Sequence, residues 1–226
     1  MTDAHIAFDD VSCVVDDVPI LRSVTTRLTA RRTAVIGANG SGKSTFARMI
    51  NGLRQPTSGT VRVLGLDSAA EGARVRSRVG FVFTNPEAQI LMPTPAEDLA
   101  LSLGSVPRAM RATRVEQILE QYGLAGRGDQ PVSELSGGQR QLLALAAVLC
   151  TDPQLVVADE PTTLLDLRNA RRIADLLLGL PVPTVIVTHD LDLAARCDEA
   201  VLFDDGRLIA IGAPPGVIET YRRLSA

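Results

Sequence analysis

Nine consecutive residues have the types and spacing of a loop that binds phosphate groups: Gly37, Ala38, Asn39, Gly40, Ser41, Gly42, Lys43, Ser44 and Thr45. They follow the apolar segment TAVI and precede FARMINGL, which is the strand-then-helix setting that the pattern GxxxxGK[ST] requires. The glycines allow backbone N–H groups to face phosphate oxygens, and the N-terminal end of the next helix adds positive potential. The segment therefore predicts a nucleotide-phosphate site.

Two side chains of this loop have specific predicted roles. Lys43 is the only lysine in the chain, and the other cationic side chains, histidine aside, are arginines. Its compact ammonium group is expected to bridge the outer phosphates, a task for which a planar guanidinium is less suited. Ser44 is expected to place its hydroxyl on Mg²⁺. The alternative interpretation is a glycine-rich turn with a surface lysine.

A second candidate anion site leads into the helical segment QRQLLALAAVLC. It consists of Leu135, Ser136, Gly137, Gly138 and Gln139. Ser136 is placed as an N-cap, and a helix N-terminus with two glycines and a hydroxyl attracts anions. The alternative is a capped helix after a loop. With this pentapeptide the sequence resembles the ABC ATPase family, whose signature motif is LSGGQ.

The resemblance covers essentially the whole chain, with all motifs in the family's order. It implies that ATP and Mg²⁺ are bound, and that the signature segment faces the γ-phosphate held by a second ABC ATPase subunit. Two subunits would then form a head-to-tail dimer with two ATP molecules between them. The sequence leaves open whether the partner is a second copy or a related chain.

Two adjacent carboxylates stand at the end of the apolar segment LVVADE. Successive residues of a strand point in opposite directions, so the two acids can have different roles. Asp159 is expected to reach Mg²⁺ or its water shell, and Glu160 to polarise the water that attacks the γ-phosphate. The alternative is a solvated turn at a strand end.

Two further positions match the family's pattern. Asp166, in the segment TLLD, occupies the place of the D-loop that joins the two active sites, and it is also placed as the N-cap of the next helix. His189 follows the apolar segment TVIVT, where the family has a histidine that contacts the γ-phosphate. The chain's other histidine, His5, has no such setting.

Two positions depart from that pattern. Val15 stands where the family commonly has an aromatic residue that stacks on adenine, so base binding is expected to depend on aliphatic contact and on the phosphates. Thr84 stands where the family has a glutamine that reaches Mg²⁺ and the attacking water. The next residues, Asn85, Pro86 and, three further on, Gln89, resemble the NPxxQ segment of energy-coupling-factor importers of vitamins and transition-metal ions. This coupling loop is expected to sense a membrane subunit.

The elements that position these residues can be read from the sequence pattern. Strand-like segments with β-branched residues occupy the N-terminal part, and strands alternate with helices after residue 151. Between residues 85 and 150 the periodicity is helical, with Val115, Ile118, Leu119 and Tyr122 on one face. We expect an α/β fold in one domain, residues 1–226. Residues 1–84 and 151–226 form its nucleotide-binding core, and 85–150 a helical lobe.

The resemblance adds detail to this fold class. It implies a P-loop NTPase core of the RecA-like kind with a mostly parallel sheet, an N-terminal antiparallel β subdomain and the inserted lobe. The segment VLFDDGRLIAIG predicts a β-hairpin near the C-terminus, with its turn at Asp205 and Gly206. An aromatic content of 3% and the absence of tryptophan require an aliphatic core.

Composition narrows the location and the partners. The net charge of −3 provides no global field for nucleic acid, which is not an expected partner. The three cysteines are widely spaced, as in a reducing cytosol. The acidic N-terminus lacks the layout of a signal peptide, and no apolar run approaches the length of a membrane span. A cytoplasmic protein, peripheral on the inner face of the cell membrane, is expected to act there through integral membrane transporter subunits.

Three functions can be compared on this basis. The leading one is the ATPase of an energy-coupling-factor importer. The second is the ATPase of another ABC system, such as an exporter or a lipid or cluster-assembly machine. A role on DNA or ribosomes is disfavoured, because those family members carry long coiled-coil insertions or paired ATPase domains, whereas each motif occurs once here. The transported substrate contacts other chains and is not encoded in these residues.

Overall fold

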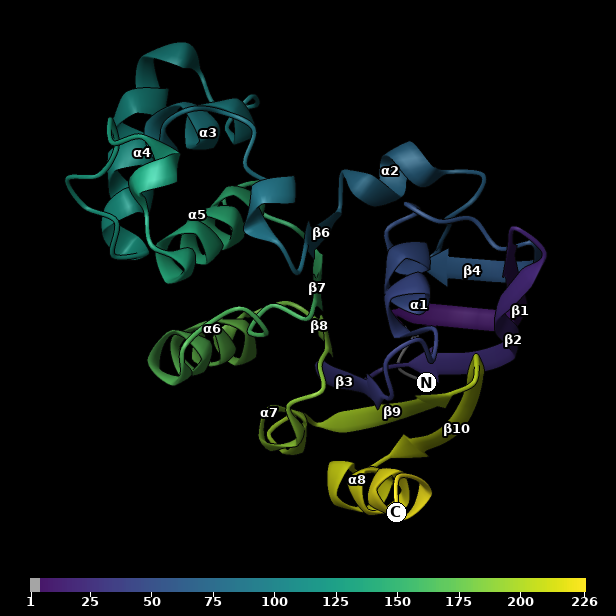
Figure 1. Cartoon of the computed structure of the whole chain (residues 1–226). Helices are drawn as coiled ribbons and strands as arrows, with labels where there is room; N and C mark the ends of the chain where they lie inside the picture. The colour runs from purple at the N-terminus through teal and green to yellow at the C-terminus, as the bar shows by residue number, and fades with distance from the viewer. Residues whose placement is uncertain (1–4) are drawn as a thin grey trace.

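The computed structural model describes residues 5–226 of the chain (Figure 1). Residues 1–4, which begin the acidic N-terminal stretch, lie outside this range. The elements, in chain order, are β1 Ile6–Val15, β2 Val18–Leu28, β3 Arg32–Gly37, α1 Lys43–Ile50, β4 Ser58–Val63, β5 Leu66–Asp67, α2 Gly72–Arg76, β6 Val79–Val82, η1 Pro86–Ala88, α3 Pro95–Ser102, α4 Arg108–Gln121, η2 Val132–Glu134, α5 Gly137–Leu149, β7 Leu155–Asp159, α6 Leu167–Gly179, β8 Thr184–Val187, α7 Leu191–Ala195, β9 Glu199–Asp204, β10 Arg207–Gly212 and α8 Pro214–Leu224.

Two sheets form the framework. The N-terminal sheet has four antiparallel strands in the order β2-β1-β4-β5. The central sheet has six strands in the order β10-β9-β3-β8-β7-β6, and all its neighbouring pairs are parallel except β9 with β10. The expected α/β class, with a mostly parallel sheet and an antiparallel N-terminal sheet, is confirmed. The predicted hairpin turn at Asp205 and Gly206 joins β9 to β10.

The central sheet separates two hydrophobic clusters. Its strands are apolar on both faces, as expected where helices or another sheet cover each side. In β7, Val156 and Ala158 face one cluster and Leu155 and Val157 the other. This alternation leaves Asp159, the last residue of β7, at the strand end with 1% exposure.

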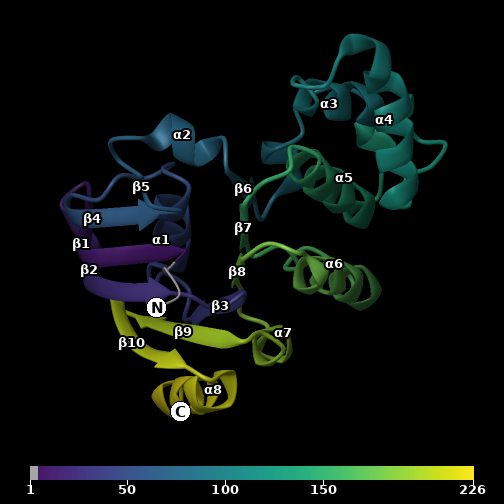
Figure 2. The same ribbon diagram turned by 180° about the vertical axis from the view of Figure 1, so that it is seen from behind.

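Helix α1 lies between the two sheets (Figures 1 and 2). Phe46 of α1 stacks on Phe8 of the N-terminal sheet, with 4.3 Å between ring centroids, and packs 4.9 Å from the ring of Phe203 in the central sheet. All three rings have 0% exposure. The helix that begins with the phosphate-loop lysine is therefore held from both sides by the chain's few aromatic residues.

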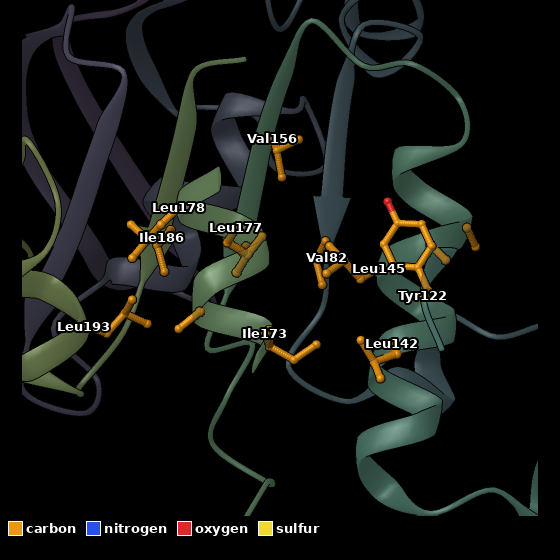
Figure 3. Close-up of a cluster of buried hydrophobic side chains, with 14 of the residues drawn as sticks. Val82, Tyr122, Leu142, Leu145, Val156, Ile173, Leu177, Leu178, Ile186 and Leu193 are labelled. Carbon is orange, nitrogen blue, oxygen red and sulfur yellow. The ribbon is translucent and has the colours of Figure 1, made fainter. Parts of the chain in front are cut away.

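The segment between β6 and β7 carries α3, α4 and α5, which lie on the side of the central sheet opposite to α1 (Figures 1 and 2). The predicted apolar face of α4 is buried: Val115, Ile118 and Leu119 are at most 5% exposed. They belong to the same cluster as Leu142 and Leu145 of α5 and Ile173 and Leu177 of α6, part of which Figure 3 shows. The helical segment thus shares its core with the central sheet.

None of the helices in residues 5–226 is long and apolar enough to cross a membrane.

Candidate functional site

The phosphate loop connects the end of β3 to the start of α1, as its pattern predicts. Gly37 has φ +141°, and a Cβ at this position would lie 2.1 Å from the carbonyl oxygen of Phe203. Only glycine fits between the loop and β9. Lys43, 6% exposed, directs its ammonium back into the loop, where Nζ donates to the carbonyl oxygens of Gly37 and Ala38 at 2.8 Å each.

The electrostatic setting of Lys43 favours an anion. Burial lowers its pKa, and the carboxylates of Glu160 and Asp159 oppose that shift. Two carbonyl oxygens are weak partners for a desolvated ammonium compared with a charged phosphate. The ammonium group of Lys43 therefore lies where the outer phosphates of a nucleotide would replace the carbonyl oxygens of Gly37 and Ala38 as its partners.

Ser44 and Asp159 lie side by side at the mouth of the loop. The hydroxyl of Ser44 donates to Oδ1 of Asp159 at 2.9 Å, and the Arg48 guanidinium of α1 lies 3.9 Å from Oδ2. Burial raises the pKa of Asp159, while the bond from Ser44 and the charge of Arg48 oppose the rise. The carboxylate is therefore buried at an energetic cost, which a cation beside it would reduce.

These two side chains fit a magnesium site. Mg²⁺ prefers oxygen ligands and usually takes only one or two from protein, completing its shell with water and substrate phosphates. Among residues 5–226, the acidic, histidine and cysteine side chains form no group of three that could enclose a metal ion. A hydroxyl and one carboxylate next to a phosphate loop match that sparse donor set.

Glu160 lies directly after β7 and is held by two side chains. Its Oε2 is 2.8 Å from Nδ1 of His189 and accepts a hydrogen bond from Thr163 Oγ1 at 2.9 Å. Glu160 has φ 52°, in the left-handed region that is costly for a residue with a Cβ. In this strained conformation of the turn after β7, the Glu160 carboxylate lies beside His189.

Neighbouring parallel strands explain the meeting of these residues. Asp159 of β7 pairs with Val187 of β8, so the residues that follow both strands emerge at the same edge of the sheet. Thr188, fully buried, accepts a hydrogen bond from Asp190 N at 3.0 Å through its hydroxyl and so shapes the turn that presents His189. His189 itself is 57% exposed at its side chain and faces outward beside Glu160.

The signature segment begins α5 with a complete capping box. The Ser136 hydroxyl accepts from Gln139 N at 3.3 Å, and Gln139 Oε1 accepts from Ser136 N at 2.8 Å. The predicted N-cap is confirmed. Leu135 is buried, whereas Ser136 and Gly137 are exposed. Because α5 and α1 lie on opposite sides of the central sheet (Figure 1), the structure does not bring the signature segment to the phosphate loop of its own chain.

The D-loop segment, residues 163–166, lies between Glu160 and the start of α5, the signature helix. Asp166 caps α6 through a bond from Asn169 N to Oδ1 at 2.9 Å, and Asn169 Nδ2 donates to Oδ2 at 2.7 Å. These bonds hold the pKa of Asp166 below its usual range, the bond from the Asn169 backbone having the largest effect. The Asn169 side chain also fills the space beside Gly138, where a Cβ would lie 2.5 Å from Cγ.

The coupling loop has unexpected contacts. The Thr84 hydroxyl donates to the backbone carbonyl of Asp159 at 2.8 Å. Asn85 caps η1 by accepting from Glu87 N at 3.0 Å, and Pro86 is buried at the first position of η1. Both polar atoms of the Gln89 amide are engaged away from the phosphate loop, with Phe83 N and Ala144 O.

Val15 ends β1 and pairs with Val18 across a tight hairpin. Val14 and Val18 are 43% and 56% exposed, so this hairpin presents aliphatic surface. The aromatic rings of Phe8, Phe46 and Phe203 are buried together in the hydrophobic core.

Three contributing residues were not predicted from sequence. Thr163 donates to Glu160, Arg48 lies beside Asp159, and Asn169 packs on Gly138. Thr163 could have been found from its place between Glu160 and Asp166. Arg48 carries a weaker signal, a basic residue one helical turn after Ser44. The contact of Asn169 joins two distant segments and has no local signature.

Comparisons with known proteins agree with this geometry. A family model described as "ABC transporter" matches residues 23–163. The biotin transport ATP-binding protein BioM of Rhizobium etli is 41% identical over 208 residues, which cover 91% of this chain and 92% of BioM. The energy-coupling factor transporter ATP-binding protein EcfA1 of Lacticaseibacillus paracasei is 38% identical over 190 residues, 80% of this chain and 68% of that protein.

Solved structures give the same result. CbiO1 of Clostridium perfringens, described as part of the ABC transporter complex cbiONQ, superposes with a TM-score of 0.84 at 28% identity, covering 99% of this chain and 94% of that chain. The ATP-binding cassette MJ0796, in a dimeric post-hydrolysis state with ADP and Pi, gives 0.81 at 26% identity, covering 92% and 98%. The family model matches most of the chain, and BioM is 41% identical over 91% of it, so the chain belongs to the ABC transporter family, among its ATP-binding subunits.

Proposed function

We propose that this chain is the Mg²⁺-dependent ATP-hydrolysing subunit of an energy-coupling-factor importer for a vitamin or a transition-metal ion. One observation carries the hydrolytic part of the proposal. The Glu160 carboxylate is held by His189 and Thr163 at the same sheet edge as the Ser44–Asp159 pair. A candidate base thus stands beside a candidate metal site at the mouth of a phosphate loop.

The phosphates of ATP bind first through the loop. Backbone N–H groups from residues 37–45 and the N-terminus of α1 face the anion. Lys43 leaves the carbonyl oxygens of Gly37 and Ala38 for the β- and γ-phosphates, exchanging two neutral acceptors for charged ones. Around the base, Val15 and its exposed neighbours Val14 and Val18 offer aliphatic contact.

Mg²⁺ would be held by Ser44 Oγ, with Asp159 binding it directly or through water. When bound, it neutralises charge on the β- and γ-phosphate oxygens. The bond between Ser44 and Asp159 keeps both oxygens at the loop before nucleotide arrives. Arg48, 3.9 Å from Asp159 Oδ2, supplies a nearby positive charge in the meantime.

Hydrolysis requires a water aligned with the γ-phosphate. Glu160 orients this water and accepts its proton as the water oxygen attacks phosphorus and the bond to ADP breaks. His189 stabilises the orientation of Glu160 through Nδ1, and its ring, which is 57% exposed, would contact the γ-phosphate. Thr163 fixes the same carboxylate oxygen from the D-loop side.

The second half of each site comes from another ATPase subunit, identical or related. Leu135, Ser136, Gly137, Gly138 and Gln139 of one subunit face the γ-phosphate bound by the other, and Asp166 lies between the two sites. This head-to-tail arrangement is consistent with the separation of α5 from α1 within one chain. The chain would act as one ABC ATPase domain, with residues 1–84 and 151–226 as core and 85–150 as lobe.

The transport part of the proposal is supported by the relatives. BioM is named for biotin transport and EcfA1 for an energy-coupling factor transporter. The coupling loop Thr84, Asn85, Pro86 and Gln89 lies at the base of the lobe, where docking of an integral membrane subunit would move α5. The subunit would work on the cytoplasmic face of the membrane, without nucleic acid as a partner.

Two measurements test the proposal. The purified chain should hydrolyse ATP with an activity that disappears on removal of Mg²⁺ by chelation and returns on its addition. Purification from membranes in mild detergent should also recover integral membrane proteins, among them a substrate-binding component for a vitamin or metal ion. Recovery of exporter or lipid-transport subunits instead would contradict the importer assignment while leaving the ATPase intact.

A further inference from the structure

Gln89 bridges the central sheet and the signature helix. Its Oε1 accepts from the backbone N of Phe83 at 3.1 Å, and its Nε2 donates to the carbonyl oxygen of Ala144 at 3.0 Å. Phe83 directly follows β6, and Ala144 lies near the middle of α5. One partly buried amide therefore ties a strand end of the core to the helix that begins with the signature segment.

The segment that joins β6 to η1 also has a polar contact with the end of β7, the strand that precedes Glu160. Thr84, next to Phe83, donates to the carbonyl oxygen of Asp159 at 2.8 Å. Further along, Glu87 lies 3.7 Å from Nε of Arg140, whose guanidinium donates to the carbonyl oxygen of Leu135 at 2.6 Å. Polar contacts thus run from the end of β7 through η1 to the first residue of the signature segment.

β6 and α5 also pack through apolar contacts, one of which lies farther along the helix. A Cβ on Gly80 would lie 2.5 Å from Cγ1 of Val148, so helix and strand approach closely there. Apolar contacts are not directional, so they define the angle of α5 less specifically than a hydrogen bond does. Ala144 lies between that point and Ser136, which is roughly 12 Å farther along the helix axis at 1.5 Å per residue. A bond at Ala144 restricts the swing of the N-terminal end of α5.

We propose that Gln89 is a positioning residue that sets the orientation of the signature segment relative to the core. It acts through α5, because its amide nitrogen donates to Ala144 O while its amide oxygen accepts from Phe83 N. The consequence for ATP-dependent dimerisation rests on the function proposed above, whereas the restraint on α5 does not. Loss of the bridge leaves the chain's own phosphate loop unchanged and makes the surface offered to the partner's ATP less defined.

The primary test is amide hydrogen exchange in the nucleotide-free protein, read by mass spectrometry. In Gln89→Ala, peptides covering residues 135–144 should exchange on the order of tenfold faster, since the lost bond to Ala144 O is one of the contacts that restrain this end of α5. Peptides covering residues 37–50 should be unchanged. Gln117→Ala is the matched control, an exposed glutamine on α4 in the same lobe. Unaltered exchange at residues 135–144 in Gln89→Ala would overturn the inference.

Gln89→Glu separates the bridge from general packing. An ionised carboxylate accepts from Phe83 N but cannot donate to Ala144 O, whereas a protonated carboxyl can do both. Relative to Gln117→Glu at the same pH, its fast exchange should be present at about pH 7 and should diminish toward about pH 4, just below the usual glutamate pKa of about 4.3. A defect of constant size across this range would show that the amide donor is not responsible and would overturn the inference.

The functional arm uses ATP-dependent dimerisation in a Glu160→Gln background. Adding Gln89→Ala should weaken dimerisation on the order of tenfold and leave ATP affinity of the monomer unchanged. Faster exchange without any change in dimerisation would reject the coupling to the partner's site. If the parent protein formed no dimer with ATP while the exchange result held, the proposed function would fail and the restraint on α5 would stand.

Discussion

Nδ1 of His189 lies 2.8 Å from Oε2 of Glu160, and the same oxygen accepts a hydrogen bond from Thr163. Replacing Glu160 by glutamine keeps the shape of the side chain and removes the charge that accepts a proton. We expect turnover to fall by about 10²–10⁴-fold with ATP affinity nearly intact, as measured by steady-state hydrolysis and equilibrium binding. Near-normal turnover in Glu160→Gln would remove this residue from the chemical step.

Thr84 is expected to act as a structural anchor for the end of β7. Thr84→Val keeps the branched shape and removes the hydroxyl that donates to Asp159 O. The loss of one partly buried hydrogen bond should cost about 1 kcal/mol, or a decrease in melting temperature of about 2–4 °C for a chain of this size. Thr84→Ser, which retains the hydroxyl, is the control. Equal melting temperatures for valine and wild type would mean that the bond contributes nothing.

Thr84→Gln distinguishes this anchor from a metal-ligand role. The longer side chain cannot repeat the short bond to Asp159 O, so the variant should melt at about the temperature of Thr84→Val. If the glutamine instead reaches Mg²⁺, hydrolysis by the isolated subunit should rise across a Mg²⁺ titration with little change in ATP affinity. Both effects are measurable on the same protein preparation.

Ser136 permits a test of the head-to-tail arrangement. Ser136→Ala and Ser136→Arg both remove the N-cap of α5, and each should lose about 1 kcal/mol of stability. Arginine alone adds bulk and charge at the exposed start of the helix, so it should also abolish ATP-dependent dimerisation, measured by size-exclusion chromatography with light scattering in the Glu160→Gln background. ATP binding by the monomer should be spared. A dimer of Ser136→Arg that matches the alanine variant would contradict the arrangement.

Gly138 and Asn169 should show strong coupling in a double-mutant cycle. Gly138→Ala places a Cβ 2.5 Å from Cγ of Asn169, whose amide is fixed by Asp166. We expect a cost of about 1–3 kcal/mol from overpacking in chemical denaturation. In the Asn169→Ala background this clash is absent. Gly138→Ala should then be neutral or stabilising, because alanine has a higher helix propensity than glycine. Additive effects would mean that the two residues do not restrict each other.

Asp159→Asn should stabilise the nucleotide-free protein while impairing Mg²⁺-dependent hydrolysis. Burial raises the pKa of Asp159, so its charged form is disfavoured by folding. Such a group contributes most to stability at low pH, and that contribution is lost as pH rises through the raised pKa. The melting temperature of the variant should therefore exceed that of wild type by a few degrees at neutral pH, with a gap that narrows as pH falls. A gap independent of pH would assign the effect to something other than the charge.

Local patterns predicted most of the framework. The phosphate loop, the buried strand before Asp159, the hairpin turn at Asp205 and Gly206, and the N-caps Ser136 and Asp166 all depend on residues close together in sequence. The short elements α2 and β5 were not predicted, because five-residue and two-residue segments have no resolvable periodicity. The order of the six central strands was not predicted, because it depends on pairing between segments that are distant in sequence.

The details of the site were less predictable. The sequence placed Glu160 and His189 at two strand ends, but their direct contact depends on the turn that gives Glu160 a positive φ. Gln89 was assigned to a coupling loop from its motif alone, and its two bonds, with Phe83 N and Ala144 O, were not predicted. These two bonds of Gln89 depend on the packing of α5 against β6, which no short segment of the sequence encodes.

The lysine of the phosphate loop bears on the period between two rounds of hydrolysis. The bonds from Lys43 Nζ to the carbonyl oxygens of Gly37 and Ala38 hold the backbone of the loop together from within. On the proposed function, ATP would meet a loop whose backbone is already ordered, which lowers the entropy cost of binding. Nucleotide exchange would then require one ammonium group to change its hydrogen-bond partners, from backbone carbonyl oxygens to phosphate oxygens and back.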